Sequence, residues 1–144
     1  MKVMLIGRTG CGKTTLAQIL NDEVIEYRKT QMILYEGEII DTPGEYLENR
    51  NYYRALSVAS GDVDIIFMLQ SAEDEESLYP PNFTEMFHGK TIYGIITKTD
   101  LNSNIERASK FLKYSGVEKI YAINSSEKAN IKEIRKLLKI SHSE

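Results

Sequence analysis

The fold of this chain is decided by one short stretch near its start, Gly7-Arg8-Thr9-Gly10-Cys11-Gly12-Lys13-Thr14. It matches the phosphate-loop pattern G-x-x-x-x-G-K-[ST], and it lies between an apolar run at residues 3–6 and a helical pattern at residues 13–20. Its glycines allow backbone amides to close around phosphate oxygens, Lys13 brings an ammonium to the β and γ phosphates, and Thr14 offers a hydroxyl to Mg²⁺. The stretch, extended by Thr15, therefore predicts a nucleotide site between a strand and a helix.

Short apolar runs recur along the chain with helical patterns between them, which predicts strands buried on both faces of a parallel sheet. One hairpin is the exception, because only Glu36-Gly37 separates its two runs. The pattern predicts a single α/β domain over residues 1–144, a three-layer αβα sandwich with a mostly parallel sheet of about six strands and about five helices. The apolar runs are 3–6, 32–35, 38–40, 65–69, 92–96 and 120–123, and the helical patterns are 13–20, 47–60, 80–87, 103–115 and 130–138.

A second phosphate-sensing element follows the run at residues 38–40. Asp41-Thr42-Pro43-Gly44 has the pattern D-x-x-G, in which Asp41 holds Mg²⁺ and the Gly44 amide meets the γ-phosphate. Read alone, this sequence is a common turn, and it gains meaning from the phosphate loop upstream. Thr30 is the expected hydroxyl that closes over Mg²⁺ in the triphosphate state, since no other Ser or Thr lies between Thr15 and Asp41.

A base-reading element is expected at Thr97-Lys98-Thr99-Asp100, which follows the run at residues 92–96 and corresponds to the pattern N-K-x-D. Asp100 accepts two hydrogen bonds from the edge of guanine, and the stem of Lys98 packs along the base. Threonine replaces asparagine at Thr97, which is expected to weaken the link to the phosphate loop without removing the carboxylate that selects guanine. Backbone amides that contact the guanine carbonyl are expected at Asn124, Ser125 and Ser126.

The composition favours a globular protein and excludes several kinds of partner. Hydrophobic residues make up 42% and charged residues 27% of the chain, and the formal net charge is -3. The single cysteine, Cys11, cannot form an internal disulfide, so the cytoplasm is the expected compartment, and a loop-filling role is favoured over redox chemistry. No segment approaches the roughly 20 apolar residues of a membrane span, and the basic last helix lacks interleaved aromatics. We therefore expect neither a membrane nor a nucleic acid as partner, and a monomer or weak dimer.

In their order along the whole chain, these elements resemble the Ras-like GTPases related to translation factors. A closer resemblance is to the EutP/PduV family, the ethanolamine- and propanediol-utilisation proteins linked to bacterial microcompartments. It rests on residues 28–31, 40–50 and 52–53, on Pro80-Pro81-x-Phe83, and on Met86-Phe87. The resemblance implies a cytoplasmic GTPase-like protein that is encoded with a metabolic microcompartment and docks on a shell protein. It also implies an ATP-dependent acetate kinase activity, which is assigned to some members.

Glu45 lies where Ras-like enzymes carry the glutamine that orients the attacking water. A carboxylate there repels the γ-phosphate and, when ionised, cannot donate a hydrogen bond, so slow intrinsic hydrolysis of GTP to GDP is expected. The expected catalytic residues are Lys13, Thr30, Gly44 and Glu45, and the expected Mg²⁺ ligands are Thr14, Thr30 and Asp41.

Three functions remain open from the sequence. The first is a GTP-dependent switch, which the carboxylate of Asp100 favours. The second is an ATP-dependent acetate kinase that uses the same phosphate loop, although the sequence reveals no separate pocket for the acceptor. The third is a module that docks on a shell protein and does not hydrolyse its nucleotide.

Overall fold

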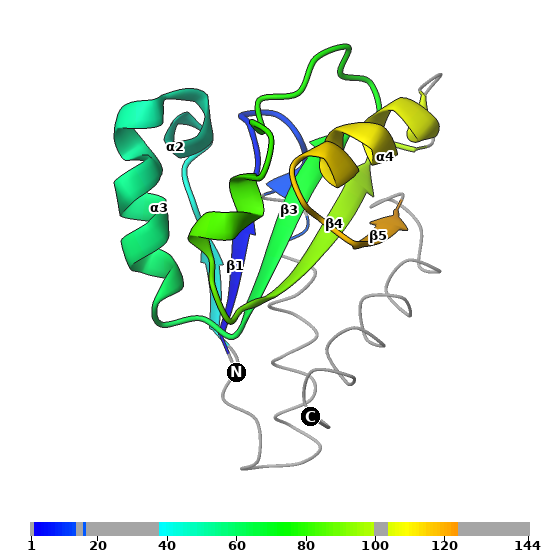
Figure 1. The fold of residues 1–144 in the computed structure, drawn as a ribbon. Coiled ribbons are helices and arrows are strands. Elements are labelled where there is room, and N and C mark those ends of the chain that lie inside the picture. Colours follow the sequence, from blue (N-terminus) through cyan, green and yellow to red (C-terminus); the bar gives the residue numbers. More distant parts are fainter. Residues whose placement is uncertain (1, 14–15, 17–37, 100–103, 124–144) are drawn as a thin grey trace.

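The computed structural model describes residues 2–13, 16, 38–99 and 104–123, which form a parallel β-sheet with helices packed on it (Figure 1). The five-stranded sheet has the order β2-β1-β3-β4-β5, and every neighbouring pair of strands is parallel. The prediction of an α/β fold with a mostly parallel sheet is confirmed, while the run at residues 32–35 lies outside the described residues. The strands are β1 (Lys2–Ile6), β2 (Glu38–Asp41), β3 (Ile65–Ser71), β4 (Thr91–Thr97) and β5 (Lys119–Ala122).

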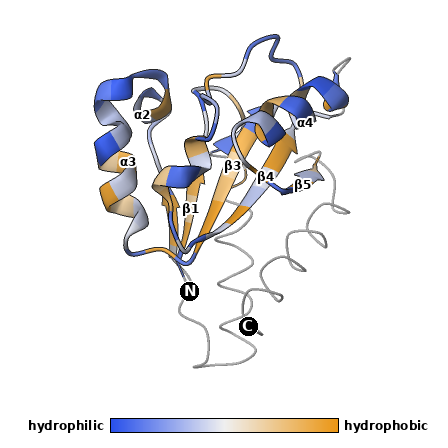
Figure 2. Cartoon of the chain, viewed as in Figure 1, coloured by the Kyte–Doolittle hydropathy of each residue, from blue (hydrophilic) through white to orange (hydrophobic). Residues whose placement is uncertain are grey.

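The apolar runs became strands because both faces of the sheet are covered. Every residue of β3, the middle strand, is buried, and so are four of the five residues of β1. Successive side chains of a strand point to opposite faces, so a strand covered on both sides is apolar at nearly every position. Figure 2 shows hydrophobic colouring along much of β1, β3 and β4, whereas the helices carry both hydrophilic and hydrophobic residues.

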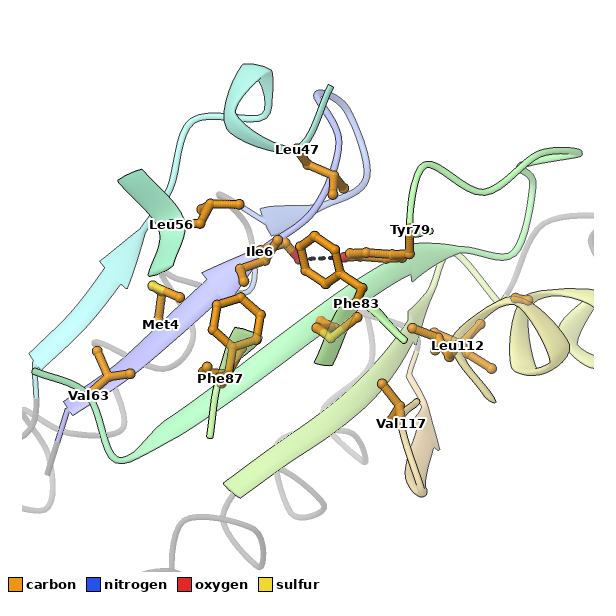
Figure 3. Packing of buried hydrophobic residues seen from close by; sticks show 14 of the residues in the cluster. Met4, Ile6, Leu47, Leu56, Val63, Tyr79, Phe83, Phe87, Leu112 and Val117 are labelled. Atoms are coloured by element: carbon orange, nitrogen blue, oxygen red, sulfur yellow. Dashed lines mark hydrogen bonds between the residues drawn. The ribbon is translucent and has the colours of Figure 1, made fainter. Parts of the chain in front are cut away.

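Two hydrophobic clusters fill the two faces of the sheet. One face buries Val3, Leu5 and Phe67 together with Cys11 and Leu16. The other face is covered by the described helices, and its cluster is drawn in Figure 3. Its members include Met4, Ile6, Leu47, Leu56, Val63, Tyr79, Phe83, Phe87, Leu112 and Val117.

Helix α4 (Ile105–Tyr114) packs closely on β4 because of a glycine in that strand. A Cβ atom on Gly94 would lie 2.9 Å from Leu112 Cδ1 and 3.0 Å from Val117 Cγ1. The side chain of Asn104 accepts a hydrogen bond of 2.9 Å from the Arg107 amide and so caps the helix at its start. Gly116, with a φ of +108°, follows its end. Among the described residues, no helix is long and apolar enough to cross a membrane.

Two predicted helices differ from the structure. The pattern at residues 47–60 is divided into α2 (Glu45–Glu48), the short 3₁₀ helix η1 (Arg50–Tyr52) and α3 (Tyr53–Ser60). The division occurs at Asn49, whose extended backbone lets its side chain accept a hydrogen bond of 3.0 Å from the Asn51 amide. The pattern at residues 80–87 yields only a 3₁₀ helix, η2 (Phe83–Met86), because Asn82 before it adopts a left-handed φ of 59°.

Candidate nucleotide-binding site

The parallel sheet brings the predicted loops to one edge. The phosphate loop follows β1, the D-x-x-G loop follows β2 and the base-reading loop follows β4. Strands β1 and β2 are neighbours, with Leu5 paired to Asp41, while β3 separates β1 from β4. All three loops therefore leave the carboxyl edge of the sheet, where ligands of open α/β folds bind.

The phosphate loop has a backbone that depends on its glycines. Gly10 and Gly12 have φ values of +83° and +103°, in the left-handed region that favours glycine. The Cys11 amide donates a hydrogen bond of 3.2 Å to the Arg8 carbonyl, which closes a turn, and the Leu16 amide donates to the Gly12 carbonyl at 3.0 Å. The Lys13 side chain lies close to Gly7 at the start of the loop: a Cβ atom on Gly7 would be 3.4 Å from the Lys13 Cδ atom. The described part of the loop thus has the glycine-dependent turns that a phosphate cradle requires.

Cys11 is a packing residue of this loop. Its side chain is 1% exposed and belongs to the hydrophobic cluster on that face of the sheet. Burial raises the pKa of the Cys11 thiol above its ordinary value, and this outweighs the opposing effect of the nearby Lys13 ammonium. A buried thiol with a raised pKa is a poor nucleophile, which supports the loop-filling interpretation.

The D-x-x-G loop packs directly on the phosphate loop. The hydroxyl and the amide of Thr42 both donate to the Leu5 carbonyl, at 2.7 and 3.2 Å. Gly44 lies against Thr9 so closely that a Cβ atom on Gly44 would collide with the Thr9 amide and hydroxyl oxygen. A glycine is therefore required at position 44 for contact between the two loops.

Glu48 adds a contact that the motifs do not announce. Its carboxylate accepts hydrogen bonds from the Thr9 amide at 3.2 Å and from the Thr9 hydroxyl at 3.4 Å. Glu48 lies one helical turn after Gly44, and residues with that spacing share one side of a helix. This spacing is the only sequence signal that pointed to Glu48, and it carries no meaning until Gly44 is known to touch Thr9.

The predicted metal ligands fit Mg²⁺ by their chemistry. Asp41 ends β2 beside the phosphate loop with an exposed carboxylate, the hard oxygen ligand that Mg²⁺ prefers. Thr14, Thr15 and Thr30 lie outside the described residues. The part of the chain that is described contains no group of three or more His, Cys, Asp or Glu side chains able to hold a metal.

The base-reading loop is joined to the phosphate loop at its first residue. Thr97 is 2% exposed, and its hydroxyl donates a hydrogen bond of 2.5 Å to the Cys11 carbonyl. Threonine at position 97, in place of the asparagine of the N-K-x-D pattern, therefore still makes a direct hydrogen bond between the two loops. Thr99 donates to the Ile123 carbonyl at 3.0 Å, which joins this loop to the end of the β5 region. Asp100 and residues Asn124, Ser125 and Ser126 lie outside the described residues.

An acidic segment after β3, residues 73–76, also reaches the site, and no motif predicted it. Asp74 lies 3.6 Å from the Arg8 guanidinium, and Glu73 lies 3.5 Å from the Lys98 ammonium. Partial burial raises the pKa of the Asp74 carboxyl above its ordinary value, and the Arg8 charge opposes that effect. The segment thus connects the phosphate loop with the base-reading loop through two charged pairs.

Tyr79 contacts the end of β1, directly before the phosphate loop. Its ring is buried, and its hydroxyl lies 3.0 Å from the Ile6 carbonyl, a contact drawn in Figure 3. The same hydroxyl lies 2.8 Å from the Leu69 carbonyl. Ile6 directly precedes Gly7, so this hydroxyl fixes the point where β1 becomes the phosphate loop. The sequence offered no signal for this role beyond the aromatic character of residue 79.

This chain is similar to several known proteins. The propanediol utilization protein PduV of Citrobacter freundii is 37% identical over 135 residues, covering 92% of this chain and 89% of that protein. The Escherichia coli K12 protein named "Probable acetate kinase EutP" is 30% identical over 136 residues, covering 92% and 86%. Translation elongation factor SelB of Methanococcus maripaludis, in complex with the GTP analogue GPPNHP, shares the fold with a TM-score of 0.64 at 17% identity. The alignment covers 98% of this chain but only 33% of the SelB chain. A family model described as "Ethanolamine utilisation - propanediol utilisation" matches residues 1–140, and the chain belongs to this PduV-EutP family.

Proposed function

We propose that this protein binds GTP and GDP with Mg²⁺ and hydrolyses GTP slowly, as a switch in the cytoplasm associated with a bacterial microcompartment. The observation that carries the proposal is the hydrogen bond from Thr97 to the Cys11 carbonyl, because it joins the predicted base-reading loop to the phosphate loop. A phosphate loop alone serves many nucleotides, whereas this link supports a role for the loop after β4 in recognising the base. Family membership supports the microcompartment association.

Each residue has a role in this proposal. Lys13 and the loop amides bind the β and γ phosphates, and Thr14, Thr30 and Asp41 hold Mg²⁺, which neutralises phosphate charge when bound. The Gly44 amide contacts the γ-phosphate from the second loop. Guanine is read by Asp100, flanked by the Lys98 stem and the backbone at residues 124–126.

The nucleotide assignment is tested by calorimetric titration with GDP, GTP, ADP and ATP, each with and without Mg²⁺. Guanine nucleotides should bind at least about tenfold more tightly than adenine nucleotides, since Asp100 accepts hydrogen bonds that adenine cannot offer. Asp100→Ala should remove this preference, while Asp62→Ala, an exposed aspartate at the start of the β3 region, should leave it intact. Equal binding of GTP and ATP by the unaltered protein would overturn the guanine assignment.

Slow hydrolysis follows from Glu45, which is exposed at the start of α2 next to Gly44. The unaltered protein with Mg²⁺ should turn over GTP far below the median enzyme rate of about 10 per second. Glu45→Gln should raise the rate about tenfold, because a neutral amide orients water without repelling the γ-phosphate. A single-turnover phosphate-release assay measures both rates. If the unaltered protein hydrolysed GTP faster than Glu45→Gln, the role assigned to Glu45 would be wrong.

An acetate kinase activity is the second candidate, favoured by relatives that are 29–30% identical and carry the name "Probable acetate kinase EutP". In that reaction a carboxylate oxygen of acetate attacks the γ-phosphorus of ATP, the bond to the ADP oxygen breaks, and acetyl phosphate and ADP form. Accumulation of acetyl phosphate from acetate and ATP, lost in Lys13→Ala, would establish it. Absence of any turnover, even with shell proteins added, would favour the third function, a shell-docking module that keeps its nucleotide.

A further inference from the structure

The Glu48 carboxylate places a negative charge on the phosphate loop. It accepts hydrogen bonds from both the amide and the hydroxyl of Thr9, at 3.2 and 3.4 Å. Among the described residues, no Lys or Arg forms an ion pair with Glu48, and the nearest charged neighbour along the loop, Arg8, is directed to Asp74 at 3.6 Å. The charge on Glu48 is therefore not neutralised by a described side chain.

The position of this carboxylate matters because of what the loop binds. A phosphate loop attracts anions through its amides, and Glu48 engages one of those amides from outside. The close approach of Gly44 to Thr9 holds the first turn of α2 at the same place. In the proposed function the second loop meets the γ-phosphate, so the added charge of a triphosphate comes toward the Glu48 side of the loop. The proposed function assigns the β-phosphate to Lys13, farther along the loop from Thr9.

We propose that Glu48 is a specificity-determining residue that lowers the affinity for nucleoside triphosphates relative to diphosphates. This inference rests on the proposed function, because it requires nucleotide at the phosphate loop. A triphosphate must bind beside an uncompensated carboxylate or displace it from Thr9, whereas a diphosphate binds with the contact in place. Glu48 thus favours the diphosphate state of the protein.

The test measures the ratio of GTP to GDP affinity by calorimetry in the full-length protein. Glu48→Gln removes the charge but keeps one oxygen that can accept the hydrogen bond from the Thr9 amide, whereas Glu48→Ala removes the charge and both acceptor oxygens. Each should raise the GTP to GDP affinity ratio about fivefold at low salt, and the increase should shrink at high salt, because the effect is electrostatic and screened by ions. Glu118→Gln is the matched control, since Glu118 is exposed and precedes β5 at the opposite edge of the sheet.

The outcomes separate this inference from the proposed function. Nucleotide binding with an affinity ratio that is the same in the unaltered protein, Glu48→Gln and Glu48→Ala would overturn the role of Glu48 and leave the proposed function standing. A change in Glu48→Ala alone would also overturn it, because it would show that the hydrogen bonds matter and the charge does not. Absence of binding in all the proteins would overturn the proposed function itself.

Discussion

The hydroxyl of Thr97, at the end of β4, donates a hydrogen bond of 2.5 Å to the carbonyl of Cys11 in the phosphate loop. Both residues are buried, so the Cys11 carbonyl has little access to water. Thr97→Val keeps the shape of the side chain but leaves this carbonyl without its partner, which should cost about 1–3 kcal/mol of unfolding free energy. Urea unfolding measures that loss, and nucleotide affinity should fall with it.

The same strand offers a control for this substitution. Thr91 begins β4 and is exposed, so Thr91→Val should change stability by less than about 0.5 kcal/mol. Thr97→Asn, which restores the common N-K-x-D residue, should preserve nucleotide binding. Equal stability of the two valine variants would show that the hydrogen bond between the loops contributes nothing.

Gly44 should tolerate no side chain, because a Cβ atom there collides with the backbone of Thr9. The φ of -56° at Gly44 suits alanine, so any effect of Gly44→Ala comes from this collision and not from backbone strain. We expect a loss of about 1–3 kcal/mol in unfolding free energy, as for other overpacked sites, and weaker binding of nucleotide. Urea unfolding and calorimetry measure the two effects.

Gly61→Ala is the comparison for Gly44→Ala. Gly61 has a similar φ of -59°, and its added Cβ atom would approach only the Val58 carbonyl, at 3.3 Å. It should cost less stability than Gly44→Ala and leave nucleotide affinity unchanged. If both alanines had the same small effect, the two loops would not be held in contact by this glycine.

Much of the fold was predictable from the sequence because strands buried on both faces are apolar at nearly every position and stand out as short apolar runs. The run at residues 65–69 corresponds to β3, and the run at residues 92–96 corresponds to β4. Each strand also includes polar residues at one or both ends, which a search for apolar runs does not detect. The prediction of a single helix at residues 47–60 was wrong, because the structure divides it into α2, η1 and α3. Its break at Asn49 accompanies the contact of Glu48 with Thr9, residues far apart in sequence.

The candidate site could be predicted from the sequence only at the loops that carry a recognisable motif. The phosphate loop and the D-x-x-G loop were identified because their backbone conformations require particular residues, such as glycine at position 12. Asp74 and Tyr79 were missed because charged and aromatic residues in a loop have many uses, and only the fold brings them to Arg8 and Ile6. Sequence patterns therefore identify loops that depend on glycine more readily than the side chains that hold those loops in place.

Tyr79→Phe should destabilise the protein and its site together. The hydroxyl is within hydrogen-bonding distance of two carbonyls, on Ile6 and Leu69, and its loss should cost about 1–2 kcal/mol of unfolding free energy. Since Ile6 precedes the phosphate loop, nucleotide affinity should also fall. Tyr53→Phe is the matched control, because both tyrosine rings pack edge-on against Phe83, at 5.4 Å for Tyr53 and 5.3 Å for Tyr79. Equally small losses in both variants would show that the Tyr79 hydroxyl contributes nothing to stability through the Ile6 and Leu69 carbonyls.

The Cys11 thiol should be unreactive in the folded protein. It is the only cysteine of the chain and is 1% exposed, so a thiol reagent at pH 8 should label the native protein slowly and label one equivalent after unfolding in urea. Labelling of the native protein as fast as free cysteine would show that the phosphate loop opens readily.

The raised pKa of Cys11 also predicts how stability depends on pH. Because burial raises the folded pKa above the ordinary value of 9.0, the unfolded chain loses the thiol proton first as the pH rises. The stabilisation from the neutral buried thiol is thus fully present below about pH 9 and is lost progressively above it. Cys11→Ala lacks this titration. The difference in unfolding free energy between the unaltered protein and Cys11→Ala should therefore be constant from pH 7 to 8 and decline by pH 10. A difference that stayed constant to pH 10 would mean that the thiol ionises equally well in the folded loop and in the unfolded chain.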